Sequence, residues 1–357
     1  MSTHKAHGDF SDFLDSRGVI TYATGNEVYD GKLLKAIMAQ QPKEGTFIDF
    51  YPATEIQSDL DLLEQIKGDP KYRRERSSAE VLGEAEVFRS IARRDWFVGA
   101  IAKKASEYDD LVHGTDVVAY IPDIDDPDNE EAMIPLAIDA TVTTEEEVID
   151  KKITTSLARV RYQKRSPGNR GGRLTKLKYI RDDDGQPLKR TMNHCILALT
   201  PDKAKVLGQE SLGQDISPDI KLETELQSLL AVRRQALVHI IIILSDFHLW
   251  GINEKIKNEL RLAFQQDGGR QLEVDIITEY LSKNIESLRQ NLKRKKQAPE
   301  IAISLEEDWK IMRYFDQLIK NKKALEKNQG WFNAVYEDCF NASERVTDLI
   351  LLNPYKS

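Results

Sequence analysis

The sequence predicts an α/β protein in which a mixed sheet flanked by helices is followed by an all-α C-terminal region. In residues 77–206, short runs of β-branched and apolar residues alternate with stretches whose apolar residues recur at helical spacing. Beyond about residue 212 the helical spacing continues without strand-like runs. We therefore expect an N-terminal α/β region of unclear role (1–76), an α/β core (77–206) and a helical C-terminal domain (212–357).

Composition is consistent with a folded chain that does not enter a membrane. The 357 residues suggest two or three domains, and 40% of them are hydrophobic, which is enough to form a sizeable core. The two cysteines, Cys195 and Cys339, are too few for a disulfide framework or a cysteine-built zinc site. No apolar run approaches the ~20 residues that span a bilayer, and the N-terminus shows no secretory signal. We expect no membrane partner and a cytoplasmic location.

The N-terminal region is predicted to contain helices around residues 30–40 and 55–66. Between them, residues 46–51 alternate and are rich in β-forming side chains, which favours a strand. Residues 68–76 are polar and contain Gly and Pro, which is typical of a linker.

The middle region begins with a helix capped by Ser77 or Ser78, and a second helical stretch is expected from Trp96 to Ile101. Thr144 and Glu147 fit a capping box that opens a later helix. Four strands are expected, at 112–121, 133–142, 174–180 and 188–199. In the C-terminal region, helical spacing covers 222–243, 252–264, 272–292, 305–326 and 331–352.

Charge is divided sharply along the middle of the chain. Residues 105–150 contain fifteen acidic residues and no Lys or Arg, whereas residues 151–181 contain eleven Lys or Arg and no acid. Carboxylates collect divalent cations, and clustered basic side chains collect phosphates. The alternative interpretation is two solvated surfaces that happen to adjoin.

Two aspartates within the expected strands are the strongest candidates for a site. Asp116 and Asp139 each lie in an apolar run, where an unpaired carboxylate is costly. Carboxylates on adjacent strands could offset that cost by binding a hard divalent cation, which would support hydrolysis. Alternatively, each aspartate caps a strand end or pairs with an arginine.

These residues resemble the PD-(D/E)XK nuclease superfamily over about residues 80–200. The shared features are a glutamate on a helix, Gly-x-Asp opening a strand, an aspartate in the next strand and a lysine-bearing helix. The resemblance implies a restriction-endonuclease-like core in which Asp116 and Asp139 hold Mg²⁺, with Mn²⁺ as a substitute. It also implies that Glu86, with Glu84 as the alternate, completes the metal site from the preceding helix.

The lysine of the motif is missing from its usual place, because Thr141 stands there. Some members of the family carry this lysine on the following helix. The resemblance then assigns the positioning of the attacking water to Lys152 or Lys151. If neither lysine reaches the site, the fold is present without activity.

The basic segment supports a nucleic-acid partner. Its phosphate-contacting candidates are Arg159, Arg161, Lys164, Arg165, Arg170, Arg173 and Lys176. Contacts of Lys and Arg with phosphates supply most nucleic-acid affinity but carry no sequence information. An ordinary solvated surface is the alternative.

The leading hypothesis is therefore a Mg²⁺-dependent nuclease that hydrolyses phosphodiester bonds, with DNA favoured over RNA as the substrate. One rival is a non-catalytic nucleic-acid-binding protein on the same fold, which the missing strand lysine favours. The other rival is a helical scaffold, in which the C-terminal helices bind a protein partner or a second copy of the chain.

Overall fold

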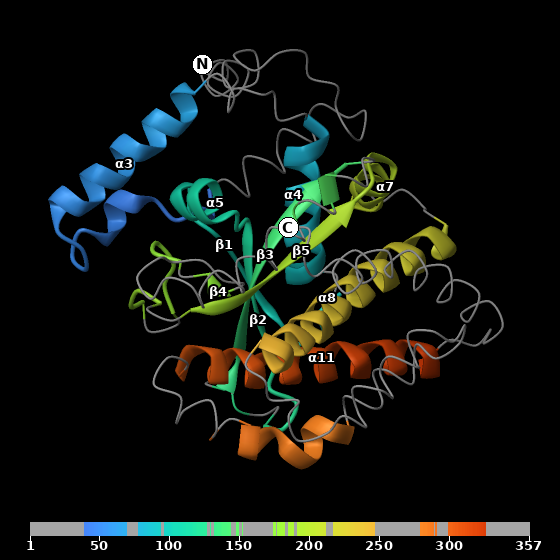
Figure 1. Ribbon diagram of the computed structural model, residues 1–357. Helices are drawn as coiled ribbons and strands as arrows, with labels where there is room; N and C mark the ends of the chain where they lie inside the picture. The colour runs from blue at the N-terminus through green and yellow to red at the C-terminus, as the bar shows by residue number, and fades with distance from the viewer. Residues whose placement is uncertain are drawn as a thin grey trace.

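A five-stranded sheet in the order β1-β2-β3-β5-β4 forms the centre of the computed structural model (Figure 1). The strands are β1 (Ile101–Lys104), β2 (Val117–Ile121), β3 (Ile134–Val142), β4 (Leu174–Thr175) and β5 (Met192–Leu199). The structure describes residues 39–69, 78–93, 96–126, 129, 132–143, 148–149, 152, 174–175, 177–182, 185–188, 191–211, 217–246, 279–288, 290 and 299–325.

The sheet is mixed, as the sequence predicted. β2 pairs antiparallel with both β1 and β3, β3 pairs parallel with β5, and β4 pairs antiparallel with β5. β2 is buried along its whole length and β3 along nearly all of it, because side chains on both faces of these central strands pack into hydrophobic clusters. The register places Ile138 opposite both Val117 on β2 and Cys195 on β5.

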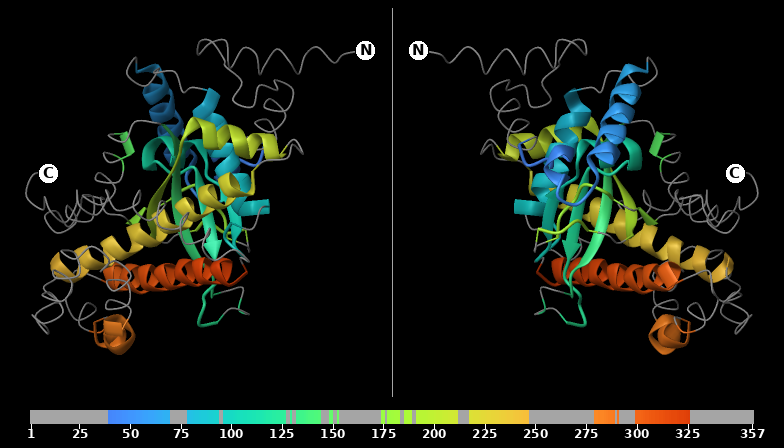
Figure 2. Two further views of the ribbon diagram at one scale, coloured as in Figure 1. Left: turned by 90° about the vertical axis from the view of Figure 1, so that its right-hand side faces the viewer. Right: turned by 90° about the vertical axis from the view of Figure 1, so that its left-hand side faces the viewer.

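Helices precede the strands in the chain, lie between β1 and β2, and follow β5. They are the 3-10 helix η1 (Glu44–Phe47) and the α-helices α3 (Ala53–Gly68), α4 (Ser78–Arg93), α5 (Glu107–His113), α7 (Pro201–Ser211), α8 (Pro218–Asp246) and α11 (Pro299–Leu325). In Figure 1, α11 crosses the lower ends of the strands and α8 runs diagonally towards it, while Figure 2 shows the same arrangement from the two sides.

The C-terminal helices share their core with the sheet. One hydrophobic cluster contains Phe88 of α4, Ile138 of β3, Leu237 of α8 and Phe315 of α11. Hydrogen bonds join the same layers, because the Gln235 side chain on α8 bonds both the N–H and the C=O of Ile196 on β5. The expected helical region is therefore confirmed where it is described, and it packs directly against the α/β part. The domain ranges 1–76, 77–206 and 212–357 stay predictions.

Two expected elements in the first hundred residues are wrong. Residues 46–51 form the end of η1 and turns instead of a strand, because the rings of Phe47 and Tyr51 both pack against Tyr179 (centroid distances of 5.3 and 5.8 Å). Residues 96–99 form turns instead of a helix, and they lead into β1. There Phe97 packs edge-on against Phe315 at 4.8 Å, and the Tyr314 hydroxyl donates to the Val98 carbonyl at 2.8 Å.

Strand bounds also differ from the expectation. The range 112–121 contains the end of α5 and a strand only from Val117, and β5 begins at Met192 instead of residue 188. In the range 174–180, Leu174–Thr175 form a strand, whereas the described residues 177–180 do not. α3, α4 and β3 agree with the sequence prediction within a few residues.

Candidate metal centre

Asp116 lies at the entrance to β2, where a glycine reverses the chain after α5. α5 begins at the cap residue Ser106, whose side chain accepts from the Asp109 N–H, and it ends at Gly114. Gly114 has φ +68°, a left-handed conformation that glycine adopts without strain. This turn brings Asp116 directly alongside β3, where its N–H donates to the Ile138 carbonyl at 2.9 Å.

The two oxygens of the Asp116 carboxylate have different surroundings. Oδ2 accepts from the Ala140 N–H at 2.8 Å, which fixes the side chain against β3. Oδ1 is buried and has no hydrogen-bond partner among the residues described. The Lys104 ammonium on β1 lies 3.7 Å from Oδ1, and both side chains are less than a tenth exposed. A buried carboxylate oxygen without a hydrogen bond is costly, and a cation in contact with it lowers that cost.

Three carboxylates from three elements converge here. Glu84 of α4, Asp110 of α5 and Asp116 each offer an oxygen, and these oxygens lie within 4.8 Å of one another. Oxygen ligands of one Mg²⁺ lie about 2.1 Å from the ion, so neighbouring ligands are separated by about 3 to 4 Å. The donor set suits a hard divalent cation, and the buried Asp116 oxygen without a hydrogen bond is consistent with a ligand position.

A glycine on α4 sets the position of Glu84. A Cβ built on Gly83 would lie 1.7 Å from Cγ2 of Val142 on β3, so only glycine allows this close approach of α4 to the sheet. Glu84 follows directly and is 8% exposed. The contact between helix and strand thus places Glu84 beside the carboxylates of Asp110 and Asp116.

Asp139 lies beside this cluster and pairs with a lysine. Its Oδ1 accepts from the Lys152 ammonium at 2.9 Å. Its Oδ2 lies 3.8 Å from the position of a Cβ on Gly114, which places the carboxylate against the turn before Asp116. The buried His194 ring contacts the Gly114 carbonyl at 2.9 Å through Nε2 and supports the same turn.

The structure thus brings several of the expected site residues together. Asp116 is in the carboxylate cluster, and Asp139 and Lys152 form an ion pair beside it. Glu86 is buried on α4 outside the cluster, and its alternate Glu84 takes that place. The metal-binding and catalytic roles of Asp116, Asp139, Glu86 and Lys152 stay predictions. Lys151 and the basic residues expected to contact phosphates, Arg159, Arg161, Lys164, Arg165, Arg170, Arg173 and Lys176, lie outside the described residues.

Sequence reasoning missed Asp110 and Lys104. Asp110 lies on α5, which the sequence pattern did not predict, and its approach to Asp116 depends on the glycine turn. Lys104 lies in a stretch without a predicted strand. Its last-residue position on β1, paired with Val117 of β2, follows from long-range strand pairing. The one local signal for this site was the Gly114-Thr115-Asp116 sequence. It indicated a turn, but it did not indicate that Asp110 and Lys104 lie beside that turn.

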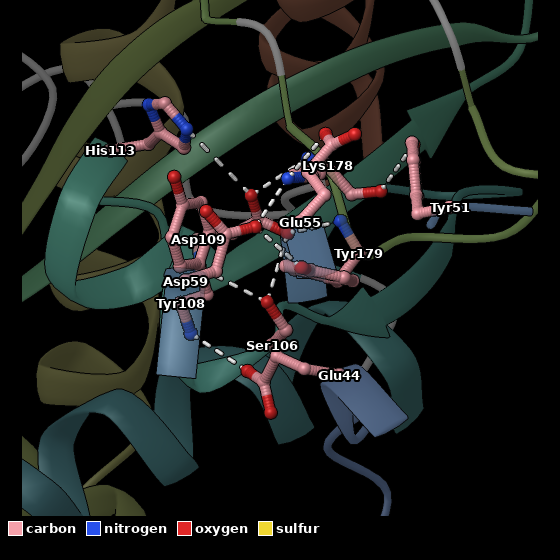
Figure 3. Close-up of polar contacts among 10 residues, drawn as sticks. All are labelled: Glu44, Tyr51, Glu55, Asp59, Ser106, Tyr108, Asp109, His113, Lys178 and Tyr179. Carbon is pink, nitrogen blue, oxygen red and sulfur yellow. Dashed lines mark hydrogen bonds and ion pairs between the residues drawn. The ribbon is translucent and has the colours of Figure 1, made fainter. Parts of the chain in front are cut away.

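A second polar network holds the other side of α5 (Figure 3). The Asp109 carboxylate is fully buried and accepts from the N–H groups of Lys178 and Tyr179, at 2.8 and 2.9 Å, and from the Ser106 hydroxyl at 2.9 Å. Burial raises the pKa of Asp109, and these three hydrogen bonds oppose the rise. Asp109 therefore fixes α5 to the segment 177–180, while its neighbour Asp110 belongs to the carboxylate cluster.

The same network attaches α3. The Tyr179 hydroxyl donates to Asp59 of α3 at 2.5 Å, and the Lys178 ammonium bonds both Asp59 and Glu55. Burial, followed by the hydrogen bond to Asp59, raises the pKa of the Tyr179 hydroxyl well above its ordinary value. Burial lowers the pKa of Lys178, but the hydrogen bonds to Asp59 and Glu55 outweigh it, so the net shift is upward. The network thus fixes α5, and with it Asp110, against α3.

Comparison with known proteins identifies no family for this chain. No family model matches the chain, and no curated protein and no solved structure matches it. Within the described ranges, no helix is long and apolar enough to cross a membrane.

Proposed function

We propose that this protein is a metal-dependent nuclease that hydrolyses phosphodiester bonds, with a restriction-endonuclease-like core. The observation that carries the proposal is the convergence of Glu84, Asp110 and Asp116, with one Asp116 oxygen buried and free of hydrogen bonds among the described residues. The chain order also supports it. A helix with Glu84, a strand opened by Asp116, a strand with Asp139 and helical residues that include Lys152 follow one another as the resemblance implies.

Glu84, Asp110 and Asp116 would hold Mg²⁺ or Mn²⁺, with Asp139 beside them. Such an ion would polarise a phosphate oxygen and lower the pKa of a bound water. In the hydrolysis, the water oxygen forms a bond to phosphorus and the bond from phosphorus to the leaving nucleoside oxygen breaks. The attacking water loses a proton to solvent, and the leaving oxygen gains one from solvent. Lys152 would hold Asp139 in place through their ion pair.

The basic segment would supply affinity for the polyanion. Phosphate contacts by Lys and Arg position a nucleic acid without reading its sequence. The charge pattern supports a nucleic-acid substrate over a small phosphate ester, and we place DNA ahead of RNA because of the resemblance to the nuclease superfamily. A second candidate function is non-catalytic nucleic-acid binding. It is supported by Thr141, which occupies the place of the motif lysine.

The test is cleavage of single- and double-stranded DNA and RNA by the full chain, with Mg²⁺ or with EDTA. Asp116→Asn is the diagnostic variant, because the amide oxygen can still accept from the Ala140 N–H while the negative charge is lost. Asp126→Asn, in an exposed loop outside the carboxylate cluster, is the matched control. We expect Mg²⁺-dependent cleavage by the wild type and by the control, and none by Asp116→Asn.

Other outcomes select the rivals. Salt-sensitive binding without cleavage supports the nucleic-acid-binding protein. If the protein neither binds nor cleaves nucleic acid, the scaffold is supported. In that case the C-terminal helices would bind another protein or a second copy of the chain. Cleavage that EDTA leaves unchanged contradicts the metal mechanism.

A further inference from the structure

Lys104 is a buried lysine whose ammonium is held at the carboxylate cluster without a hydrogen bond. Its side chain is 8% exposed, and its Nζ lies 3.7 Å from Asp116 Oδ1, beyond hydrogen-bond distance. An ammonium carries three N–H donors. Within the part of the chain that is described, the ion pair with Asp116 is the polar contact of this ammonium, so its donors are open to a ligand.

The neighbouring lysines have other partners. Lys103, the preceding residue on β1, donates to the Arg181 carbonyl at 3.1 Å and lies over the Tyr120 ring at 4.8 Å. Lys152 is bonded to Asp139, and its side chain is 36% exposed. Lys104 therefore combines burial, a position on a strand and open donors at the carboxylates.

Such an arrangement leaves the donors of Lys104 available to an anionic ligand at the carboxylate cluster. An ammonium on a largely buried side chain gains free energy from each hydrogen bond that it makes, and an ion pair at 3.7 Å does not supply one. Oδ1 of Asp116 is buried and has no hydrogen bond to a described residue. An anionic oxygen next to a cation bound at Asp116 would satisfy the donors of Lys104.

We propose that Lys104 is a catalytic residue of this site, whose ammonium donates to a non-bridging oxygen of the scissile phosphate. This inference rests on the proposed nuclease function and deepens it. Lys104 supplies from β1 the positive charge that Thr141 cannot supply from β3. The negative charge on the phosphoryl oxygens is best stabilised by donors already in place, so Lys104 acts mainly on the transition state. Lys152 then serves to orient Asp139.

Lys104→Met and Lys104→Arg test this role in the full chain. Methionine keeps the approximate length and the burial without the charge, whereas arginine keeps the charge. Lys103→Met is the matched control, because it removes the adjacent lysine, which has partners away from the cluster. The measurements are the cleavage rate at saturating Mg²⁺ and substrate, KM, and Mn²⁺ binding by calorimetry.

We expect Lys104→Met to lower kcat by about 100-fold or more, as loss of one preorganised donor does, with KM changed less than about threefold. Mn²⁺ should bind this variant at least as tightly as the wild type, because a repelling positive charge is gone. The kcat of Lys104→Arg should be at least about tenfold higher than that of Lys104→Met. Lys103→Met should keep the wild-type kcat. If Lys104→Met fails to bind Mn²⁺ or to fold, Lys104→Gln replaces it in the same comparison.

Two results overturn the inference, and they are distinguishable. If the wild type cleaves and a folded, Mn²⁺-binding Lys104→Met or Lys104→Gln cleaves within about threefold of it, Lys104 is only structural and the nuclease function stands. If the wild type cleaves no nucleic acid with Mg²⁺, the proposed function fails and the role of Lys104 fails with it.

Discussion

Replacing Gly83 by alanine tests whether the close approach of α4 to β3 builds the site. The added Cβ would lie 1.7 Å from Val142 Cγ2, whereas carbon atoms in contact are separated by about 3.5 Å or more. Val142 is 4% exposed in the core, so its side chain has little room to move. The helix must therefore retreat from the strand by up to ~2 Å.

The magnitude follows from two opposing effects. Overpacking a core costs about 1 to 3 kcal/mol, and alanine in a helix interior recovers up to ~1 kcal/mol relative to glycine. Because an approach of 1.7 Å is a severe overlap, the upper part of the overpacking range applies, and we expect Gly83→Ala to lower the free energy of unfolding by about 1 to 2 kcal/mol. A shift of this size also moves Glu84 out of the group of oxygens that lie within 4.8 Å, so Mn²⁺ affinity should fall by at least ~10-fold.

The assay is urea unfolding followed by circular dichroism, together with calorimetry of Mn²⁺ binding. Gly68→Ala is the matched control, because a Cβ there meets nothing within 4 Å. Val142→Ala removes the clashing methyl groups, so the double variant Gly83→Ala/Val142→Ala should be more stable than the sum of the single effects by about 1 kcal/mol or more. Strict additivity, or a Gly83→Ala protein as stable as the wild type, would refute the close-packing argument.

The remaining predictions concern the site, the basic segment and the buried network. Asp139→Asn should abolish cleavage and change the free energy of unfolding by no more than about 1 kcal/mol, because its ion pair with Lys152 is partly exposed; wild-type turnover by a contaminant-free preparation would contradict this. Arg170→Ala with Arg173→Ala should weaken binding to all sequences equally and flatten the plot of log affinity against log salt by up to ~2 units; an unchanged slope and affinity would mean that these side chains are only solvated. Stability should fall as the pH rises past 10.0, the ordinary pKa of tyrosine, because the pKa of Tyr179 is raised in the folded protein and the unfolded chain therefore loses its proton first. Urea unfolding at pH 8 and pH 11 should show a smaller loss for Tyr179→Phe than for the wild type, and equal losses would contradict the raised pKa.

The sequence by itself determined the elements that local pattern controls. α3, α4 and β3 lie close to their predicted ranges, because apolar spacing and capping residues act within a few residues of one another. The same pattern predicted the mixed α/β class and the helices that follow. It also marked Asp116 and Asp139 as costly carboxylates in apolar strands, and the structure places both at one turn.

Tertiary structure decided the rest, because long-range packing overrode local preference. The alternating residues 46–51 became η1 and turns when Phe47 and Tyr51 packed on Tyr179, more than a hundred residues away. The acid of α4 at the cluster is Glu84, because the contact between Gly83 and Val142 sets which face of the helix meets β3.

Asp110 and Lys104 could not be predicted for the same physical reason. Asp110 reaches Asp116 only through the left-handed turn at Gly114, and Lys104 reaches it only through the pairing of β1 with β2. A site assembled from separate helices and strands depends on three-dimensional contacts, which residue spacing along the chain does not encode.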